Sequence, residues 1–578
     1  MIRLLGFIKP YWKVALLAPV LMLIEVVTDL YQPLLLASII DEGVVNGDVP
    51  YVLKTGLKML GIAIIGMAGG VGCTIAASHA SQNFGADVRT ALFKKVQSFS
   101  FTNLDQFKTS SLITRLTNDI TQVQNMVLMA LRIMVRAPLL CIGGIVMTVV
   151  INPRLAAILL VSIPVMLTFM FLIIRAGFPL FSLVQTKIDR VNNVMQENLA
   201  GVRVVKAFVR QNQEEKRFKG ANDDLMDTTM KASRLVALAM PLIMLIMNAS
   251  IVAVLWFGGL QVNTGNMQVG QVMAFINYMM QILFSLMMVA FIFIMLSRAK
   301  ASADRINEVL DTDVDIADPS DATEVIPTKG QVVFDNVTFH YAKAQGDPVL
   351  KNISFTVEPG ETVAILGGTG SGKTTLVSLI PRLYDINEGR ILFDGEDIRA
   401  MKLADLRQKI SIVLQDSVLF SGTIEDNIKW GWADATSDEV EEIANMAQAH
   451  EFINRFPDGY QTLLGQRGVN VSGGQKQRLS IARALLKKPC VLILDDSTSA
   501  VDMGTEARLQ QALKQRETKS TTFVIAQRIS SVMDADRILL LDNGQIVAEG
   551  THTQLLQTSP LYQDIYQSQM GEEDIVNG

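Results

Sequence analysis

The sequence predicts a two-part protein, in which a helical membrane domain precedes a soluble α/β domain. Two observations carry this prediction. Long apolar runs fill residues 1–310, whereas residues 331–568 show the short strands, helices and Gly-rich loop of an ordinary soluble α/β domain. In addition, a chain of 578 residues is too long for a single hydrophobic core.

The first part is expected to contain six membrane-spanning helices. A helix that crosses a bilayer needs about 20 mostly apolar residues. Six segments meet this requirement, at 14–36, 56–80, 127–150, 155–177, 236–260 and 272–297. The first of them shows no short apolar region followed by a small-residue cleavage site, so we expect it to stay in the bilayer.

Lys and Arg are distributed unevenly between the loops, and this predicts the orientation. The long segments 81–126 and 178–235 are rich in both, whereas the short segments 41–50 and 261–271 contain neither. Because positive residues favour the cytoplasmic side, we expect both long segments and both termini in the cytoplasm. The chain is therefore expected to be a multi-pass membrane protein.

The two long segments have apolar residues at helical spacing, so we expect the membrane helices to extend into the cytoplasm. A break near 101–107 and another near 201–208 predict short helices that dock on another domain. The acidic segment 311–330 is expected to be a linker. Residues 569–578 are expected to be a tail that is disordered from Gly571.

The bulk composition excludes other classes of protein. A net charge of -5 is too small to indicate a nucleic-acid partner. The three cysteines, Cys73, Cys141 and Cys490, form no CxxC pair and no spacing typical of a metal site. We therefore expect buried, unpaired thiols in a reducing compartment.

Residues 367–374 form a phosphate-binding loop. They match GxxxxGK[ST] without a mismatch and lie between an apolar strand at 362–366 and a helix expected at 374–383. The glycines let backbone N–H groups converge on phosphate oxygens, and the helix N-terminus favours negative charge. Lys373 is expected to reach the β- and γ-phosphates of ATP, and the Thr374 hydroxyl to bind Mg²⁺. The expected ATP-binding residues of this loop are Gly367, Gly368, Thr369, Gly370, Ser371, Gly372, Lys373, Thr374 and Thr375.

A buried strand at 491–495 ends in Asp495, at the carboxyl edge where open α/β sheets bind ligands. Its carboxylate is expected to hold the Mg²⁺ ion together with Thr374. The sequence Ser-Gly-Gly-Gln at 472–475 lies shortly before this strand.

These motifs together resemble those of an ABC transporter ATPase. The set comprises the phosphate loop, Gln415 in the segment VLQDSVLF, the signature at 472–475, Asp495, and a loop that ends at Asp502. With six membrane segments ahead of it, nearly the whole chain resembles a half-transporter of the type IV ABC exporters. Within that family it is most similar to the degenerate-site subunit of heterodimeric bacterial multidrug exporters. This resemblance implies that the protein lies in the inner (plasma) membrane of a bacterium.

The resemblance implies roles for individual residues. Tyr341 would stack on adenine, which is reasonable for a planar ring that faces a base. Gln415 would contact Mg²⁺ or the attacking water, and Asp502 would lie at the interface between two chains. The signature residues would contact the γ-phosphate of an ATP that a partner chain holds; they are Ser472, Gly473, Gly474 and Gln475.

Two positions depart from the family's pattern. Asp496 stands where a catalytic Glu is expected, and its carboxylate is one methylene shorter in reach. Gln527 stands where a His is expected, and an amide can hydrogen-bond to a phosphate but carries no titratable proton. General-base catalysis contributes about 10²–10⁴-fold and requires reach before a suitable pKa. We therefore expect this chain's own site to hydrolyse ATP slowly.

The signature at 472–475 is intact, so it would complete a competent ATP site on a partner chain. A second half-transporter that supplies the missing Glu and His is the expected partner. A homodimer with two slow sites is the alternative assembly.

The sequence carries less information on the transported molecule. Glu25 and Asp29 are an acidic pair in the first membrane segment, and two interpretations are open: attraction of cationic drugs, or a structural pair with neighbours such as Arg132 or Arg136. The expected function is ATP-driven efflux of hydrophobic or cationic small molecules from the membrane lipid. The alternatives are a lipid or peptide exporter of the same fold, and an ATP-gated regulatory or channel subunit.

Overall fold

The computed structural model describes residues 3–319, 327–341, 346–516 and 519–576. The chain divides into two compact units, one formed by Met1–Gln97 with Thr109–Thr312 and the other by Ser98–Lys108 with Asp313–Gly578. The predicted fold class is confirmed, because six long apolar helices are followed by an α/β nucleotide-binding domain. The short segment Ser98–Lys108 is an unexpected member of the second unit.

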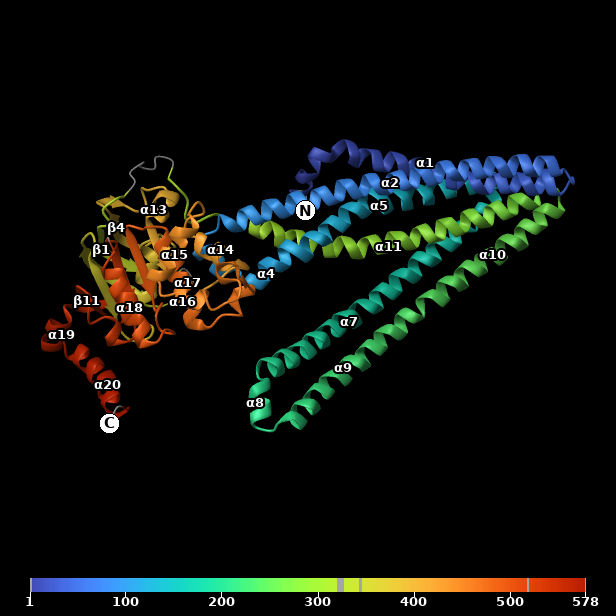
Figure 1. The fold of residues 1–578 in the computed structure, drawn as a ribbon. Coiled ribbons are helices and arrows are strands. Elements are labelled where there is room, and N and C mark those ends of the chain that lie inside the picture. Colours follow the sequence, from blue (N-terminus) through green and yellow to red (C-terminus); the bar gives the residue numbers. More distant parts are fainter. Residues whose placement is uncertain (1–2, 320–326, 342–345, 517–518, 577–578) are drawn as a thin grey trace. The chain divides into compact units, whose positions relative to one another are not determined.

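The first unit is helical throughout its described residues (Figure 1). Its helices are α1 (Trp12–Ser38), α2 (Val49–Gln97), α4 (Thr109–Thr114), α5 (Ile120–Ile151), α6 (Pro153–Ala156), α7 (Leu159–Ala200), α8 (Val202–Ala207), α9 (Gln211–Ala237), α10 (Ala239–Asn263) and α11 (Val269–Asp311), with a 3₁₀ helix η1 (Leu4–Tyr11) and π-helical turns η2 (Ile39–Val44) and η3 (Arg115–Asp119). Six stretches of these helices are long and apolar enough to cross a membrane. The first five predicted segments lie within the first five stretches, and the sixth, 272–297, overlaps the last stretch, Val269–Val289.

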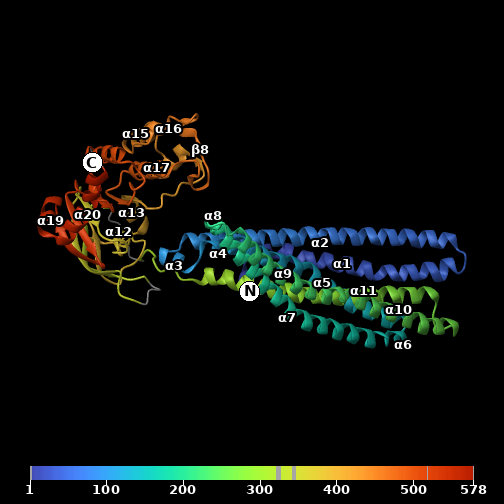
Figure 2. The same cartoon turned by 90° about the horizontal axis from the view of Figure 1, so that it is seen from below.

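The helices are longer than a bilayer requires, as predicted. Helix α2 has 49 residues, which corresponds to about 70 Å of helix, against about 30 Å for the hydrocarbon core. Helices α1, α2, α5 and α11 run side by side, and α7 packs along α9 (Figure 2). The predicted short helix at the second break is present as α8.

A glycine and a buried carboxylate support the contacts between these neighbouring helices. A Cβ atom on Gly69 of α2 would lie 3.0 Å from the Leu21 carbonyl oxygen of α1, so the two helices need glycine at this approach. Between η3 and α11, the buried Asp119 accepts hydrogen bonds from Ser302 Oγ and Arg305 Nε, each at 2.8 Å. A buried carboxylate that is paired in this way costs far less than an isolated one.

The second unit contains two larger sheets and surrounding helices. A four-stranded sheet has the order β2-β1-β4-β5, and a six-stranded sheet has the order β12-β11-β3-β10-β9-β6. Its elements are α3 (Phe101–Gln106), β1 (Val332–Phe339), β2 (Leu350–Val357), β3 (Thr362–Leu366), α12 (Lys373–Leu379), β4 (Glu388–Phe393), β5 (Glu396–Asp397), α13 (Leu403–Lys409), β6 (Ile410–Val413), β7 (Gly422–Thr423), α14 (Ile424–Lys429), α15 (Ser437–Met446), α16 (His450–Ile453), β8 (Leu463–Leu464), α17 (Gly473–Leu486), β9 (Val491–Asp495), α18 (Met503–Lys514), β10 (Thr521–Ile525), β11 (Arg537–Asp542), β12 (Gln545–Gly550), α19 (His552–Thr558) and α20 (Pro560–Val576).

The register of the six-stranded sheet places the functional segments at one edge. Strands β3, β10 and β9 are parallel, with Ile525 opposite both Ile365 and Asp495. The loops that follow these three strands therefore leave the sheet together. They carry the phosphate loop, Asp496 and Gln527.

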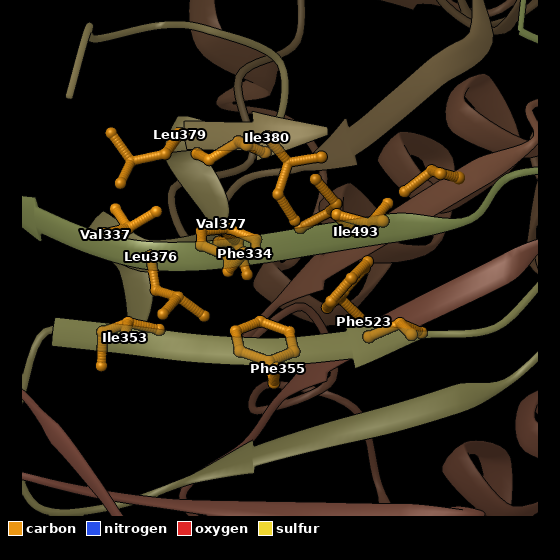
Figure 3. Packing of buried hydrophobic residues seen from close by; sticks show 14 of the residues in the cluster. Phe334, Val337, Ile353, Phe355, Leu376, Val377, Leu379, Ile380, Ile493 and Phe523 are labelled. Carbon is orange, nitrogen blue, oxygen red and sulfur yellow. The ribbon is translucent and has the colours of Figure 1, made fainter. Parts of the chain in front are cut away.

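The core that supports this edge lies between the two sheets (Figure 3). Phe334 and Phe355 of the four-stranded sheet stack with ring centroids 4.7 Å apart, and Leu376 and Val377 of α12 are buried beside them. Burial of side chains of this size stabilises a fold by about 1.5–3 kcal/mol each. Helix α12 is therefore fixed through its apolar face, and the phosphate loop at its N-terminus is fixed with it.

The first predicted docking helix is present as α3, and it packs within the nucleotide-binding unit. Tyr384 donates a hydrogen bond from its hydroxyl to Asp105 Oδ2 at 3.0 Å, and its ring lies 5.9 Å from that of Phe101. Asn103 Nδ2 also donates to the Asp313 carbonyl at 3.1 Å. Burial, and then the bond to Asp105, raise the pKa of Tyr384 above its usual range.

Helix α20 ends at Val576, and disorder of the tail from Gly571 stays a prediction. One expectation needs correction. The three cysteines are unpaired as expected, but only Cys73 is buried, while Cys141 and Cys490 are partly exposed.

Candidate functional site

The phosphate loop adopts the conformation that its glycines allow. Gly370 and Gly372 have φ angles of +83° and +102°, which residues with a side chain rarely adopt. A Cβ atom on Gly368 or Gly370 would meet nothing within 4 Å, so the inner side of the loop is open. The loop joins β3 to α12 as predicted, although α12 ends earlier than expected, at Leu379. This geometry provides an open cradle of backbone N–H groups.

Lys373 is the cation of this cradle. Its Nζ atom donates hydrogen bonds to the carbonyl oxygens of Gly367 and Gly368 at 2.8 and 2.7 Å, and the residue is 9% exposed. Burial lowers the pKa of the Lys373 ammonium, while the carboxylates of Asp495 and Asp496 oppose that shift. A buried ammonium held at the mouth of a glycine loop is suited to a phosphate anion.

The residues beside Lys373 fit ATP and Mg²⁺. The buried Ser371 Oγ has no hydrogen-bond partner among the described residues, as expected for a group that contacts a phosphate. Thr374 Oγ1 donates to Asp495 Oδ1 at 3.1 Å, which places two hard oxygen ligands side by side. Burial raises the pKa of Asp495, a cost that a dication would offset.

A metal ion at this place would depend on the nucleotide as well as on the protein. Within the described ranges, no group of three or more His, Cys, Asp or Glu residues could hold a metal. Mg²⁺ is commonly bound by one or two protein ligands together with phosphate oxygens and water. Thr374 and Asp495 are sufficient for such a site.

The two departures from the family's pattern meet at a single carboxylate oxygen. Gln415 Nε2 and Gln527 Nε2 each donate a hydrogen bond to Asp496 Oδ2, both at 3.2 Å. Asp496 has a φ angle of +46°, a left-handed conformation that Asp tolerates better than most residues. Burial raises the pKa of Asp496, and the hydrogen bond from Gln415 opposes that shift. The carboxylate is therefore held by two amide groups that neither give up nor accept a proton during a reaction.

The signature forms the N-terminus of α17. Ser472 Oγ accepts a hydrogen bond from Gln475 N at 3.3 Å, and Gln475 Oε1 accepts one from Ser472 N at 2.8 Å. Ser472 and Gly473 are exposed, and a Cβ atom on Gly474 would lie 2.6 Å from the Ala500 carbonyl oxygen. The result is an exposed helix N-terminus with a favourable dipole for an anion. Its use by a partner chain remains a prediction.

Two other predicted residues have local partners. The Tyr341 hydroxyl lies 3.0 Å from Thr375 Oγ1, and its ring meets that of Phe339 edge-on at 5.0 Å. Tyr341 is therefore beside the phosphate-loop helix, and its contact with adenine remains a prediction. Asp502 Oδ1 accepts a hydrogen bond from Thr505 N at 2.9 Å and caps α18. That bond lowers the pKa of Asp502, and its place at a chain interface remains a prediction.

Gln477 is a functional residue that sequence reasoning missed. Its side chain is buried, donates to Ser499 Oγ at 3.2 Å and accepts from Ala500 N at 3.0 Å. It therefore ties the signature helix to the loop that follows Asp496. The available signal was a Gln on the helix face whose other buried positions are mostly apolar.

Glu506 and Gln569 were missed as well. The buried Glu506 accepts hydrogen bonds from the hydroxyls of Thr498 and Ser531, at 2.7 and 2.6 Å, and so joins the segments that follow Asp496 and Gln527. Gln569 of α20 donates to the Gln527 carbonyl oxygen at 2.8 Å. No sequence pattern connects a residue near the C-terminus with this position.

In the first unit, which contains the membrane helices and is called the membrane unit below, Glu25 and Asp29 both pair with Arg136. Arg136 Nη1 lies 2.6 Å from Glu25 Oε1, and Arg136 Nη2 lies 2.9 Å from Asp29 Oδ2. This is the structural pairing that the sequence left open. Binding of a substrate by Glu25 and Asp29 remains a prediction.

The chain is similar to known proteins in both sequence and fold. A family model described as "ABC transporter transmembrane region" matches residues 15–287, and one described as "ABC transporter" matches residues 350–499. The uncharacterized ABC transporter ATP-binding protein YfiB of Bacillus subtilis is 47% identical over 99% of this chain and 99% of its own. The fatty acid ABC transporter ATP-binding/permease protein of Mycobacterium bovis is 39% identical over 82% of this chain and 75% of its own. A solved structure of a bacterial Atm1-family ABC exporter with ATP bound has a TM-score of 0.80 at 27% identity, covering 96% of this chain and 98% of that one.

Proposed function

The chain belongs to the ABC transporters, as a type IV exporter half-transporter with its membrane region fused to an ABC ATPase domain, and on this premise we propose that its own ATP site is slow. Members of this family bind ATP and couple its hydrolysis to transport across a membrane. The proposed chain is one half of a heterodimeric exporter. It contributes a degenerate site of its own and an intact signature to the competent site of its partner.

The observation that carries the proposal is the contact of both Gln415 and Gln527 with one oxygen of Asp496. A general base must present a free oxygen within about 3 Å of the water that it deprotonates. Here the side chain is one methylene shorter than that of Glu, and one of its two carboxylate oxygens, Oδ2, already accepts hydrogen bonds from two amide groups. Because Gln527 carries no titratable proton, it cannot relay one to or from the phosphate. The site is therefore built to bind ATP and to react slowly.

The other residues of the site support tight binding of ATP. Lys373 would hold the β- and γ-phosphates, and Thr374 and Asp495 would bind Mg²⁺, which neutralises phosphate charge when present. Ser371 would donate its free hydroxyl to a phosphate oxygen. The position of Tyr341 beside Thr375 supports a contact with the adenine at the outer end of the site.

The proposal of one slow and one competent ATP site in a two-chain complex follows from where the altered residues lie. Asp496 and Gln527 lie beside this chain's own phosphate loop, whereas the signature at Ser472 is intact and exposed. A partner with Glu and His at the corresponding positions would gain a complete site from this signature. A homodimer would contain two slow sites and is the alternative assembly.

The proposed cargo is a hydrophobic small molecule taken from the membrane, with both termini and the nucleotide-binding unit in the cytoplasm. Multidrug efflux is one form of this function, and export of a lipid or peptide is the alternative. The lipid alternative gains support from a relative described as a fatty acid transporter. Attraction of cations loses support, because Arg136 pairs with both Glu25 and Asp29.

A substrate panel on the purified two-chain complex tests the export function. We expect at least one hydrophobic compound to raise the rate of ATP hydrolysis, because transport and turnover are coupled. The measurement is phosphate release in nanodiscs with increasing compound, together with uptake into inverted vesicles. ATP-dependent ion conductance without turnover would instead indicate a gated channel subunit and would contradict the proposal.

A further inference from the structure

The membrane unit contains a cavity that the nucleotide chemistry does not use. It has a volume of about 670 Å³ and is lined by residues of α1, α2 and α5. This volume falls within the range of small-molecule sites, about 300–1,000 Å³. Two glycines of α2, Gly66 and Gly70, line it. A Cβ atom on Gly70 would lie 2.8 Å from Glu25 Oε2, so glycine at this position leaves room for the Glu25 carboxylate.

The charged groups at the cavity differ in whether they have an ion-pair partner. Glu25 and Asp29 both pair with Arg136, so one guanidinium holds the two carboxylates. Arg132 also lines the cavity, and the described residues give its guanidinium no ion pair or hydrogen bond. Its Nε atom is buried and without a partner. An arginine in a membrane segment normally pairs with an anion. The unpaired N–H donors of Arg132 are therefore the groups that could bind an anionic ligand.

An apolar strip lies beside this cation. Met67, Val71 and Ile75 follow one another at a spacing of four residues on α2, and all three line the cavity. Their side chains are more than half exposed in the chain. A ligand that satisfies both features has an anionic head at Arg132 and an alkyl chain along these residues.

We propose that this cavity binds an amphiphile with a carboxylate or phosphate head group, which Arg132 recognises. Binding at Arg132 does not depend on the proposed export function. Only the further step, that the bound amphiphile is the exported molecule, rests on that proposed function. The surplus negative charge of Glu25 and Asp29 over Arg136 limits how tightly the head group is held, because like charges repel.

Binding of radiolabelled oleate to the full chain in phosphatidylcholine nanodiscs, without ATP, tests the proposal. We expect saturable binding that weakens about tenfold or more in Arg132→Gln, the size of a lost hydrogen bond to a charged group, and much less in Arg132→Lys. Arg175→Gln is the matched control, because Arg175 is an exposed arginine on α7 that does not line the cavity. We expect it to bind oleate like the wild type.

Asp29→Asn separates an anion site from a cation site. It removes one negative charge beside Arg132, so an anion should bind more tightly, whereas a cationic analogue, oleylamine, should bind more weakly. Equal oleate binding in the wild type and Arg132→Gln, or preference for oleylamine, would overturn the proposal. Nanodiscs that contain phosphatidylglycerol identify the source: competition with oleate indicates a membrane lipid, and its absence indicates a free fatty acid. Because no ATP is present, failure here leaves the slow-site proposal standing.

Discussion

Replacing Asp496 by Glu together with Gln527 by His is expected to raise ATP turnover at this chain's own site by about 10²-fold or more. The added methylene brings the carboxylate towards the attacking water. The imidazole restores a group that can carry a proton where the Gln527 amide cannot. It also removes one of the two amide donors that engage Asp496 Oδ2.

Single replacements show how the two positions divide the effect. We expect Asp496→Glu alone to give part of the gain, and Gln527→His alone to give little, because the short carboxylate remains. Asp416→Glu is the matched control, since it lengthens an exposed carboxylate next to Gln415 without touching Asp496. Phosphate release in the two-chain complex, with the partner's own catalytic Glu replaced by Gln, isolates this site. No gain from the double variant would show that these two residues do not limit it.

Gly473→Asp is expected to reduce ATP turnover of the two-chain complex by about 10²-fold, although this residue is not one of the catalytic positions of the chain's own ATP site. The helix N-terminus of the signature would meet the γ-phosphate of the partner's ATP, and a carboxylate there replaces attraction by repulsion. The substitution is tolerated by the fold, because a Cβ atom on Gly473 would lie 3.5 Å from Ala500 Cβ, an ordinary contact.

Two further variants test whether the loss of turnover is specific to the signature. Gly220→Asp introduces the same charge at an exposed helical glycine with free space, and we expect it to leave turnover unchanged. Asp496→Asn should also change turnover of the complex little, because the slow site contributes little to it. A complex that tolerates Gly473→Asp but loses its activity with Asp496→Asn would reverse the assignment of the two sites.

Sequence patterns predicted the parts of the site that depend on neighbouring residues. The phosphate loop, Asp495 and the six apolar helices are each set by a local run of residues, and parallel pairing brings Asp495 to the same sheet edge. Contacts between distant residues could not be predicted. Gln415 and Asp496 are 81 residues apart, and their hydrogen bond depends on how two loops leave the sheet.

The same limit explains the other differences. The sequence named Arg132 and Arg136 as candidates, but only helix packing decides which of them faces Glu25 and Asp29. The membership of Ser98–Lys108 in the nucleotide-binding unit depends on the contact of Asp105 with Tyr384, 279 residues away.

The steady-state ATPase rate of the purified chain alone, measured beside that of the chain with its partner, tests the slow site most directly. The partner is identified by co-purification from the native membrane. We expect the chain alone to bind ATP but to release phosphate slowly, with a rise of about 10²-fold or more when the partner joins. Robust turnover by the chain alone would contradict a degenerate site built from Asp496 and Gln527.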